Sequence, residues 1–191
     1  MQIYNRADIV NFMEMSEKFK RMQGFTDGSK SSNITTYNRR YIDEKIQRSD
    51  PTGTATSIAY AFDRIVDNDI HEKLATIQDD EILTEKVKIL SVDFNKKVGN
   101  AYEARLRTFS VIPDTDGDGT DAYTYSGTFN AASEIQKGTA TVTADGMEAT
   151  FTASTVQPAS LEENSAPENS TSESSAKTLA SKTTNKNDDI L

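Results

Sequence analysis

Alternation of apolar and polar positions is the clearest pattern in the chain, and it predicts β-strands. Ile58, Tyr60 and Phe62 fall two apart, so a strand over residues 57–64 would place all three on one face. The same period predicts strands over residues 86–95, 101–112 and 123–130, with residues 95–100 as a hairpin connection. Residues 138–151 repeat it on both sides of Asp145-Gly146, a dipeptide typical of tight hairpin turns.

A helical period occurs in one stretch. Ile70, Leu74 and Ile77 are spaced i, i+4, i+7, which predicts a helix over residues 67–79 with Asp67 or Asn68 as its N-cap. Residues 7–15 fit either a short helix or a strand. Weak alternation favours a strand over residues 18–26, and residues 28–33 are predicted to form a Ser-rich loop. The predicted fold is therefore mainly β (α+β), an antiparallel β-sandwich or barrel of about six to eight strands with one flanking α-helix and a long extended loop.

The stretch before the strand at 57–64 fits neither a core nor a linker. Aromatic, aliphatic and charged side chains are mixed there: Tyr37, Arg39, Arg40, Tyr41, Ile42, Asp43, Glu44, Lys45 and Ile46. Such a segment is too charged to be core and too apolar to be plain linker. We expect residues 35–53 to form an extended loop or arm. Together with the Thr-rich strand at Gly138–Thr143, this predicts a protein that contacts copies of itself through sheet edges and loops.

Composition divides the chain in two. The apolar fraction of 35% is below the usual share for a soluble fold, and no aromatic residue follows Phe151. Residues 155–191 consist mainly of Ser, Thr, Asn, Glu, Lys and Ala, which cannot bury enough apolar surface to offset the entropy of ordering. We therefore expect a folded domain at residues 1–154 and a disordered tail at 155–191.

Charge and residue content exclude several classes of protein. A formal net charge of -9 argues against a protein that embraces nucleic acid, since such affinity comes from Lys and Arg neutralising phosphates. The absence of cysteine excludes disulfides and thiolate metal sites. No stretch approaches the roughly 18 consecutive apolar residues of a membrane span, and the start has no signal-like apolar region. The expectation is a soluble protein made in the cytoplasm.

One loop resembles a calcium site. Asp114, Asp116 and Asp118 occupy positions 1, 3 and 5 of an EF-hand-like loop that continues to Asp121, with Gly119 at position 6. The twelfth position, which should be a bidentate Glu, is Tyr125, and the flanks read as strands. We prefer a turn-rich hairpin loop and expect no dedicated metal site, with weak calcium binding as the alternative.

Signs of catalysis are absent from the sequence. His71 is the only histidine, and we expect a surface or boundary residue of the predicted helix instead of a catalyst. No nucleophile elbow or phosphate-cradling Gly-rich loop occurs, so we expect no enzymatic activity and no cofactor.

The order of motifs resembles the tail tube (major tail) proteins of long-tailed bacteriophages of Gram-positive bacteria. The resemblance covers about residues 19–152. Its motifs are YIDEK at 41–45, SDPTGTATSIAYAFD at 49–63, the helix core IHEKL at 70–74, the strand at 101–111, YSG at 125–127 and the hairpin at 138–152.

This resemblance implies a structural protein of the virion tail. Six copies would close into a ring and rings would stack into a tube, with the stretch at 35–53 reaching the neighbouring ring. DNA would pass an acidic lumen without specific binding. The implied partners are further copies of the chain, a tape measure protein inside the tube, and tail terminator and distal tail proteins at its ends. Residues 155–191 would be an extra tail.

Two alternatives remain open at the sequence level. One is another phage ring protein, a tail terminator or head-tail joining protein. The other, ranked last, is a calcium-binding β-sandwich adhesion module that works through residues 114–121.

Overall fold

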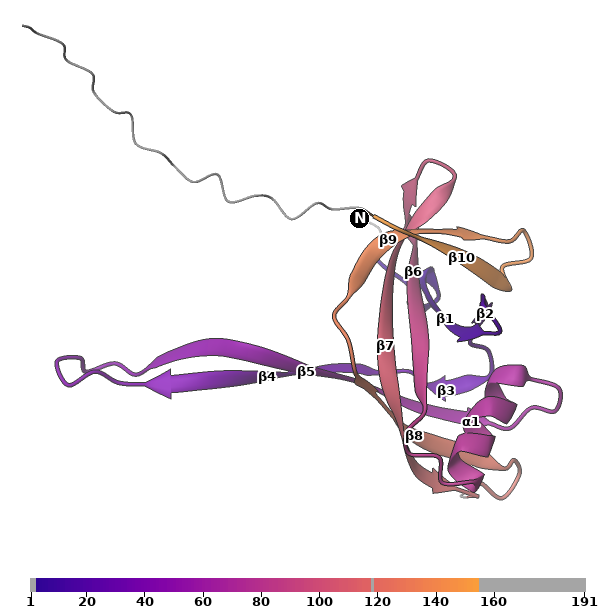
Figure 1. The fold of residues 1–191 in the computed structure, drawn as a ribbon, viewed down its shortest axis with the longest axis horizontal. Coiled ribbons are helices and arrows are strands. Elements are labelled where there is room, and N and C mark those ends of the chain that lie inside the picture. The colour runs from indigo at the N-terminus through magenta and orange to yellow at the C-terminus, as the bar shows by residue number, and fades with distance from the viewer. Residues whose placement is uncertain (1–2, 118, 155–191) are drawn as a thin grey trace, which may run out of the picture. The chain divides into compact units, whose positions relative to one another are not determined.

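Antiparallel β-strands make up most of the chain that the structure, a computed structural model, describes, namely residues 3–117 and 119–154 (Figure 1). The strands are β1 (Ile9–Met15), β2 (Lys18–Arg21), β3 (Phe25–Asp27), β4 (Lys30–Arg39), β5 (Arg48–Asp63), β6 (Lys86–Val98), β7 (Ala101–Asp116), β8 (Thr124–Ala131), β9 (Gln136–Val142) and β10 (Glu148–Ala153). Within these residues there is one α-helix, α1 (Asp69–Asp79), and one 3-10 turn, η1 (Arg6–Asp8). The predicted mainly β fold with one α-helix is confirmed, with 10 strands instead of about six to eight.

Six of the strands close into a barrel. They run in the order β7, β6, β1, β2, β10, β9, and β9 pairs back onto β7 over Tyr102↔Ala140 to Leu106↔Gln136. Closure removes the free strand edges that an open sheet would expose. Every strand of the barrel contributes to its core: Val10, Phe12, Phe19, Leu90, Val92, Ala104, Ala140 and Ala149.

A second core lies where the sheet leaves the barrel. The C-terminal half of β7 pairs with β8, β8 pairs with β5, and β5 pairs with β3 and β4. Helix α1 packs against this open part of the sheet, and the shared core contains Met13, Ile58, Tyr60, Phe62, Ile70, Leu74, Ala75, Ile77, Val87, Ile89, Phe109, Val111, Tyr125 and Phe129. Strand β6 serves both cores, since Ile89 faces the second core while Leu90 faces the barrel.

Several predicted elements change in detail. Residues 9–15 form a strand instead of a helix, and the strand expected over 18–26 is divided by Gly24, whose φ of +73° suits glycine. The Ser-rich loop expected at 28–33 is wrong from Lys30 onward, where β4 begins. The extended loop expected at 35–53 is a β-hairpin, because its two halves pair with each other. The turns at Gly99 and Gly146 confirm the two predicted hairpins, both glycines having positive φ.

His71 anchors the beginning of α1 and is fully buried, so the expectation of a surface or boundary residue is wrong. Asn68 caps the helix by accepting hydrogen bonds from the Ile70 and His71 amides at 3.1 and 3.3 Å. The His71 ring stacks on Phe62 with centroids 4.4 Å apart. Its Nδ1 accepts from the Ile65 amide at 3.1 Å, which leaves Nε2 as the donor to the Gln23 carbonyl at 2.8 Å. The neutral imidazole therefore forms hydrogen bonds with two backbone groups, one in the connection between β2 and β3 and one in the connection between β5 and α1.

The burial of this ring predicts acid-sensitive stability. Burial lowers the pKa of His71, although the hydrogen bond to the Gln23 carbonyl and the charges of Glu72 and Asp63 oppose the shift. Because the folded-state pKa lies below the unfolded value of about 6.5, unfolding takes up a proton as the pH falls through that value. Stability is therefore expected to be complete above about pH 7 and to decrease below about pH 6.5. Urea unfolding of His71→Gln should show a flatter dependence between about pH 5.5 and 7, since the chain has no other histidine. An unchanged slope would assign the effect to other groups.

Candidate self-assembly arm

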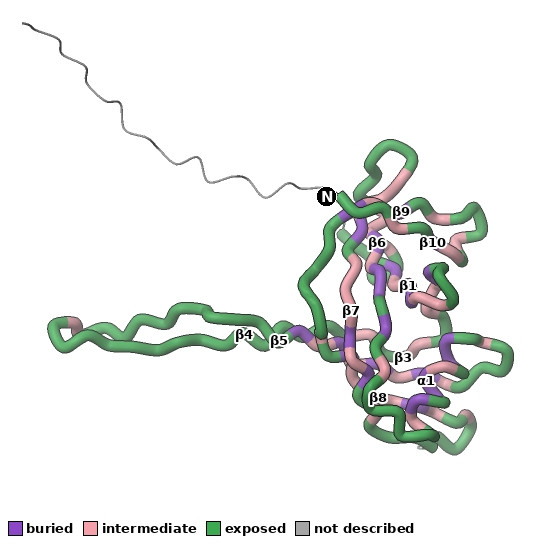
Figure 2. Tube along the Cα trace, viewed as in Figure 1, coloured by how far each residue is buried: buried purple, intermediate pink, exposed green. Residues whose placement is uncertain are grey.

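The hairpin of β4 and β5 projects away from both cores. We call residues 30–55 the arm. All are exposed except Glu44, which is half-buried, and burial begins only at Thr56 and Ile58 (Figure 2). A two-stranded ribbon with no packed face is marginally stable alone in water. The arm is therefore an element whose stability would increase on contact with another surface.

The two strands of the arm pair with each other in a ladder that extends the sheet. Its strands pair from Lys30↔Ile58 to Arg39↔Arg48, with an irregularity where Thr35 pairs with Gly53 and Thr36 with Pro51. One more residue, Thr52, therefore lies on β5 than on β4, and its hydroxyl donates to the Thr35 carbonyl at 3.2 Å. Strand β5 continues without a break from the arm into the second core.

The two faces of the arm differ in charge. On one face Tyr37 and Arg39 lie opposite Asp50 and Arg48, and Arg39 pairs with Asp50 at 3.5 Å. The other face is uncharged over its middle, where it carries Ser32, Ile34, Thr36, Asn38, Ser49, Pro51 and Thr54. Such a surface offers an apolar and hydroxyl-rich side and a charged aromatic side to a partner.

The tip, residues 39–48, is held by contacts between arginines and aromatic rings. The Arg39 guanidinium lies 5.7 Å from the Tyr37 ring centroid and 5.3 Å from that of Tyr41. Arg48 lies 5.5 Å from the Tyr41 centroid and forms a bidentate ion pair with Glu44. These contacts organise the tip without burying its aliphatic side chains.

Aliphatic side chains of the arm remain in water. Ile34 and Ile46 are 59% and 78% exposed, and Ile42 is fully exposed. Burying one such side chain completely is worth roughly 1.5–3 kcal/mol. Three of them on one projecting hairpin make the arm a candidate contact surface.

The structure brings together all the residues that sequence reasoning assigned to self-assembly. Tyr37 and Arg39 lie on β4, and Arg40 to Ile46 form the connection. Sequence reasoning missed Ile34 as part of this surface, as well as the pairing of Arg39 with Asp50. An isoleucine isolated in a Ser/Thr-rich run was the available signal for the first.

The Asp-rich loop is only partly described. Asp114 and Asp116 lie at the end of β7, Asp118 lies outside the described residues, and Asp121 follows in the connection to β8. The Tyr123 hydroxyl donates to the Asp116 carboxylate at 2.7 Å. Among residues 3–117 and 119–154 no group of three or more His, Asp and Glu side chains is arranged to hold a metal. Weak calcium binding at this loop stays the alternative to the predicted turn-rich hairpin loop.

The similarity of this chain to known proteins lies in its fold. No family model and no curated protein matches the sequence. In the described part of the chain, no helix is long and apolar enough to cross a membrane.

Solved structures with the same fold include the following three. A chain of the SPP1 tail tube aligns with a TM-score of 0.57 and 12% identity, covering 70% of this chain and 77% of that one. A chain of a native gene transfer agent virion gives 0.51 and 14%, covering 71% and 98%. A chain from the tail of an empty gene transfer agent particle, which has C6 symmetry, gives 0.51 and 15%, covering 70% and 97%. The chain therefore has a fold found in a phage tail tube and in gene transfer agent particles.

Proposed function

We propose that this chain is a structural tail tube protein whose copies form rings that stack into a hollow tube for passage of a viral genome. The fold shared with the SPP1 tail tube chain carries the proposal. The exposed arm adds a second line of support, because it presents apolar surface that has no covering partner within residues 3–117 and 119–154. A protein of this kind works through self-association and needs no catalytic group.

The proposed ring contains six copies. One of the structures with this fold comes from a tail with C6 symmetry. Contacts around such a ring close on themselves, whereas the contact along the axis repeats without closing. A protomer therefore needs two separate self-contacts, and a projecting arm is suited to the axial one.

We assign the axial contact to the tip of the arm. Tyr41, Ile42 and Ile46 would supply apolar contact area there, and Arg39, Arg40 and Lys45 would supply charge. The arginine contacts described above would restrict the tip and so reduce the entropy lost on docking.

Further parts of the proposal rest on the motif resemblance. The source would be a long-tailed phage of Gram-positive bacteria, with the chain synthesised in the host cytoplasm and located in the virion tail. A tape measure protein would occupy the tube, and terminator and distal tail proteins would cap it. The net charge of -9 suits a lumen that DNA passes without binding, since carboxylates repel phosphates.

Electron microscopy of the purified full chain tests the proposal. Long tubes with a central channel would support a tube protein. Isolated rings that never stack would point to a terminator, and monomers at every concentration would contradict both.

Truncation after Ser154 is expected to leave assembly unchanged. Residues 155–191 contain no aromatic residue and few aliphatic ones, so they offer little apolar surface for a contact between copies. Tube length and yield, measured by electron microscopy and sedimentation, should match those of the full chain. Loss of tubes would show that this segment takes part in assembly.

A further inference from the structure

The segment that follows α1 is acidic, apolar and exposed. We call residues 79–85, which begin at the last residue of α1, the post-helix segment. It carries Asp79, Asp80, Glu81 and Glu85 and no basic residue. Between these charges lie Ile82 and Leu83, 37% and 71% exposed. Hydrogen bonds fix its backbone, since the Asp80 amide donates to Thr76 O at 3.0 Å and the Ile82 amide to Ile77 O at 2.9 Å.

The position of these carboxylates is electrostatically unfavourable within one chain. A helix C-terminus carries partial negative charge and is stabilised by cations. The last turn of α1 has no basic residue, and Asp79 and Asp80 stand there instead. Asp79 accepts a hydrogen bond from the Tyr125 hydroxyl at 3.2 Å and lies 3.9 Å from Arg64, and Glu85 pairs with Lys73 at 3.3 Å. No described residue forms an ion pair with Asp80 or Glu81. A cation from outside the chain would relieve this repulsion.

The tip of the arm has the complementary composition. Its four basic residues, Arg39, Arg40, Lys45 and Arg48, outnumber Asp43 and Glu44, in a chain of net charge -9. Arg48 and Arg39 are engaged by Glu44 and Asp50, whereas the described residues provide no ion pair for Arg40 or Lys45. Ile42 and Ile46 lie beside these free cations and are exposed. Both surfaces thus combine exposed aliphatic side chains with unpaired charge of opposite sign.

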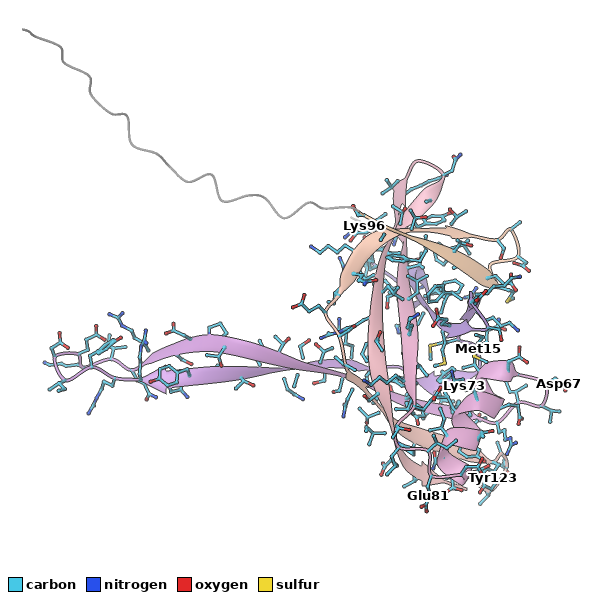
Figure 3. All side chains as sticks on the ribbon, in the orientation of Figure 1. Met15, Asp67, Lys73, Glu81, Lys96 and Tyr123 are labelled. Carbon is cyan, nitrogen blue, oxygen red and sulfur yellow. The ribbon has the colours of Figure 1, made fainter. Side chains whose placement is uncertain are left out.

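One chain cannot join its own two surfaces. The arm leaves the two cores on the side away from α1, at the left of the view, whereas Glu81 lies at the bottom of the view (Figure 3). A contact between them must be made by two copies, head to tail, and such a heterologous contact repeats indefinitely unless it closes into a ring. This is the geometry that axial stacking of protomers requires.

We infer that the arm tip of one copy docks on the post-helix segment of another copy. The inference rests on the proposed function and names the receiving surface of its axial contact. Arg40 and Lys45 would face Asp80 and Glu81, and Ile42 and Ile46 would cover Ile82 and Leu83. Burial between apolar side chains strengthens the ion pairs at such an interface by excluding water.

A charge exchange tests the contact in the full chain. Arg40→Glu with Lys45→Glu, and separately Asp80→Lys with Glu81→Lys, should each raise the concentration needed for tube growth by at least about tenfold. The chain carrying all four changes should regain tubes. Glu17→Lys is the matched control, because Glu17 is also exposed and also has a positive φ (71°, against 51° for Glu81). It should assemble as the unmodified chain does.

The outcomes separate this inference from the proposed function. If reversal at Asp80 and Glu81 leaves tubes normal while reversal at the arm blocks them, the receiving surface is wrong and the tube function stands. Failure of the fourfold variant to assemble also overturns the pairing. If the unmodified chain forms no tubes, the proposed function itself fails.

Disulfide trapping gives a readout that does not depend on charge. The chain has no cysteine, so Ile42→Cys with Leu83→Cys introduces the only thiols. Oxidation of its tubes should give a ladder of covalent multimers on a non-reducing gel, because each copy would be linked at both ends. Each single variant should give no ladder. Absence of a ladder from oxidised tubes of the double variant would contradict the contact.

Discussion

Deletion of Tyr41–Lys45 is expected to abolish tube formation while leaving the domain folded. The deletion removes Ile42, Lys45 and the Tyr41 ring that organises Arg39 and Arg48, and it touches neither core. Sedimentation should find the variant unpolymerised at concentrations where the unmodified chain forms tubes. Its circular dichroism and unfolding midpoint should match those of the unpolymerised unmodified chain, since exposed hairpin residues contribute little to monomer stability.

A length-matched variant separates the side chains from the length of the connection. Replacing the same residues with glycine and serine keeps the reach of the arm and removes its chemistry, so it should also prevent assembly. Normal tubes from either variant would show that the axial contact lies elsewhere on the chain.

Phe62→Ala is expected to destabilise the fold by about 3–5 kcal/mol, the usual cost of removing a fully buried phenylalanine. Phe62 is completely buried and lies at the centre of an aromatic cluster. Its ring centroid is 4.4 Å from that of His71, 5.3 Å from Phe25 and 5.5 Å from Tyr125. The truncation would leave a cavity between β5 and α1. Urea denaturation should show the loss as a lower midpoint with a similar slope.

Ile42→Ala supplies the matched comparison for this loss. It also truncates an apolar side chain, but one that is fully exposed, so its effect on the monomer should stay within about 0.5 kcal/mol. Assembly, in contrast, should be weakened by Ile42→Ala. A large stability loss at Ile42, or none at Phe62, would contradict the division between a folded core and an exposed arm.

Alternation predicted the strands that bury one face. Ile58, Tyr60 and Phe62 point into the second core, and Leu90 and Val92 into the barrel, as their spacing required. It could not predict β4, because every residue from Lys30 to Arg39 is exposed on both faces and the strand exists through its pairing with β5. A period-2 pattern of apolar residues arises when one face of a strand is buried. A strand with no buried face therefore shows no such pattern.

The sequence left a sandwich and a barrel open and could not decide between them. Closure of the barrel depends on the pairing of β9 with β7, as in Ala104↔Gly138, a long-range pairing that no local motif encodes. The arm residues were identified because their mixture of charge and aromatic rings was unsuited to the core. Their organisation by Arg39 and Arg48 needed the hairpin register, which sets which side chains meet. His71 was misplaced because its burial depends on stacking against Phe62 and on a hydrogen bond with the Gln23 carbonyl, which is 48 residues away in the sequence.

The continuity of β5 has a mechanical consequence. A pull on the tip of the arm would run along this strand into its pairing with β8, which extends from Ser57↔Asn130 to Asp63↔Thr124. The hydrogen bonds of that ladder lie across the strand, so such a force would shear them together instead of opening them one at a time. In the proposed tube, tension would then be carried from ring to ring through the β5–β8 ladder of each protomer.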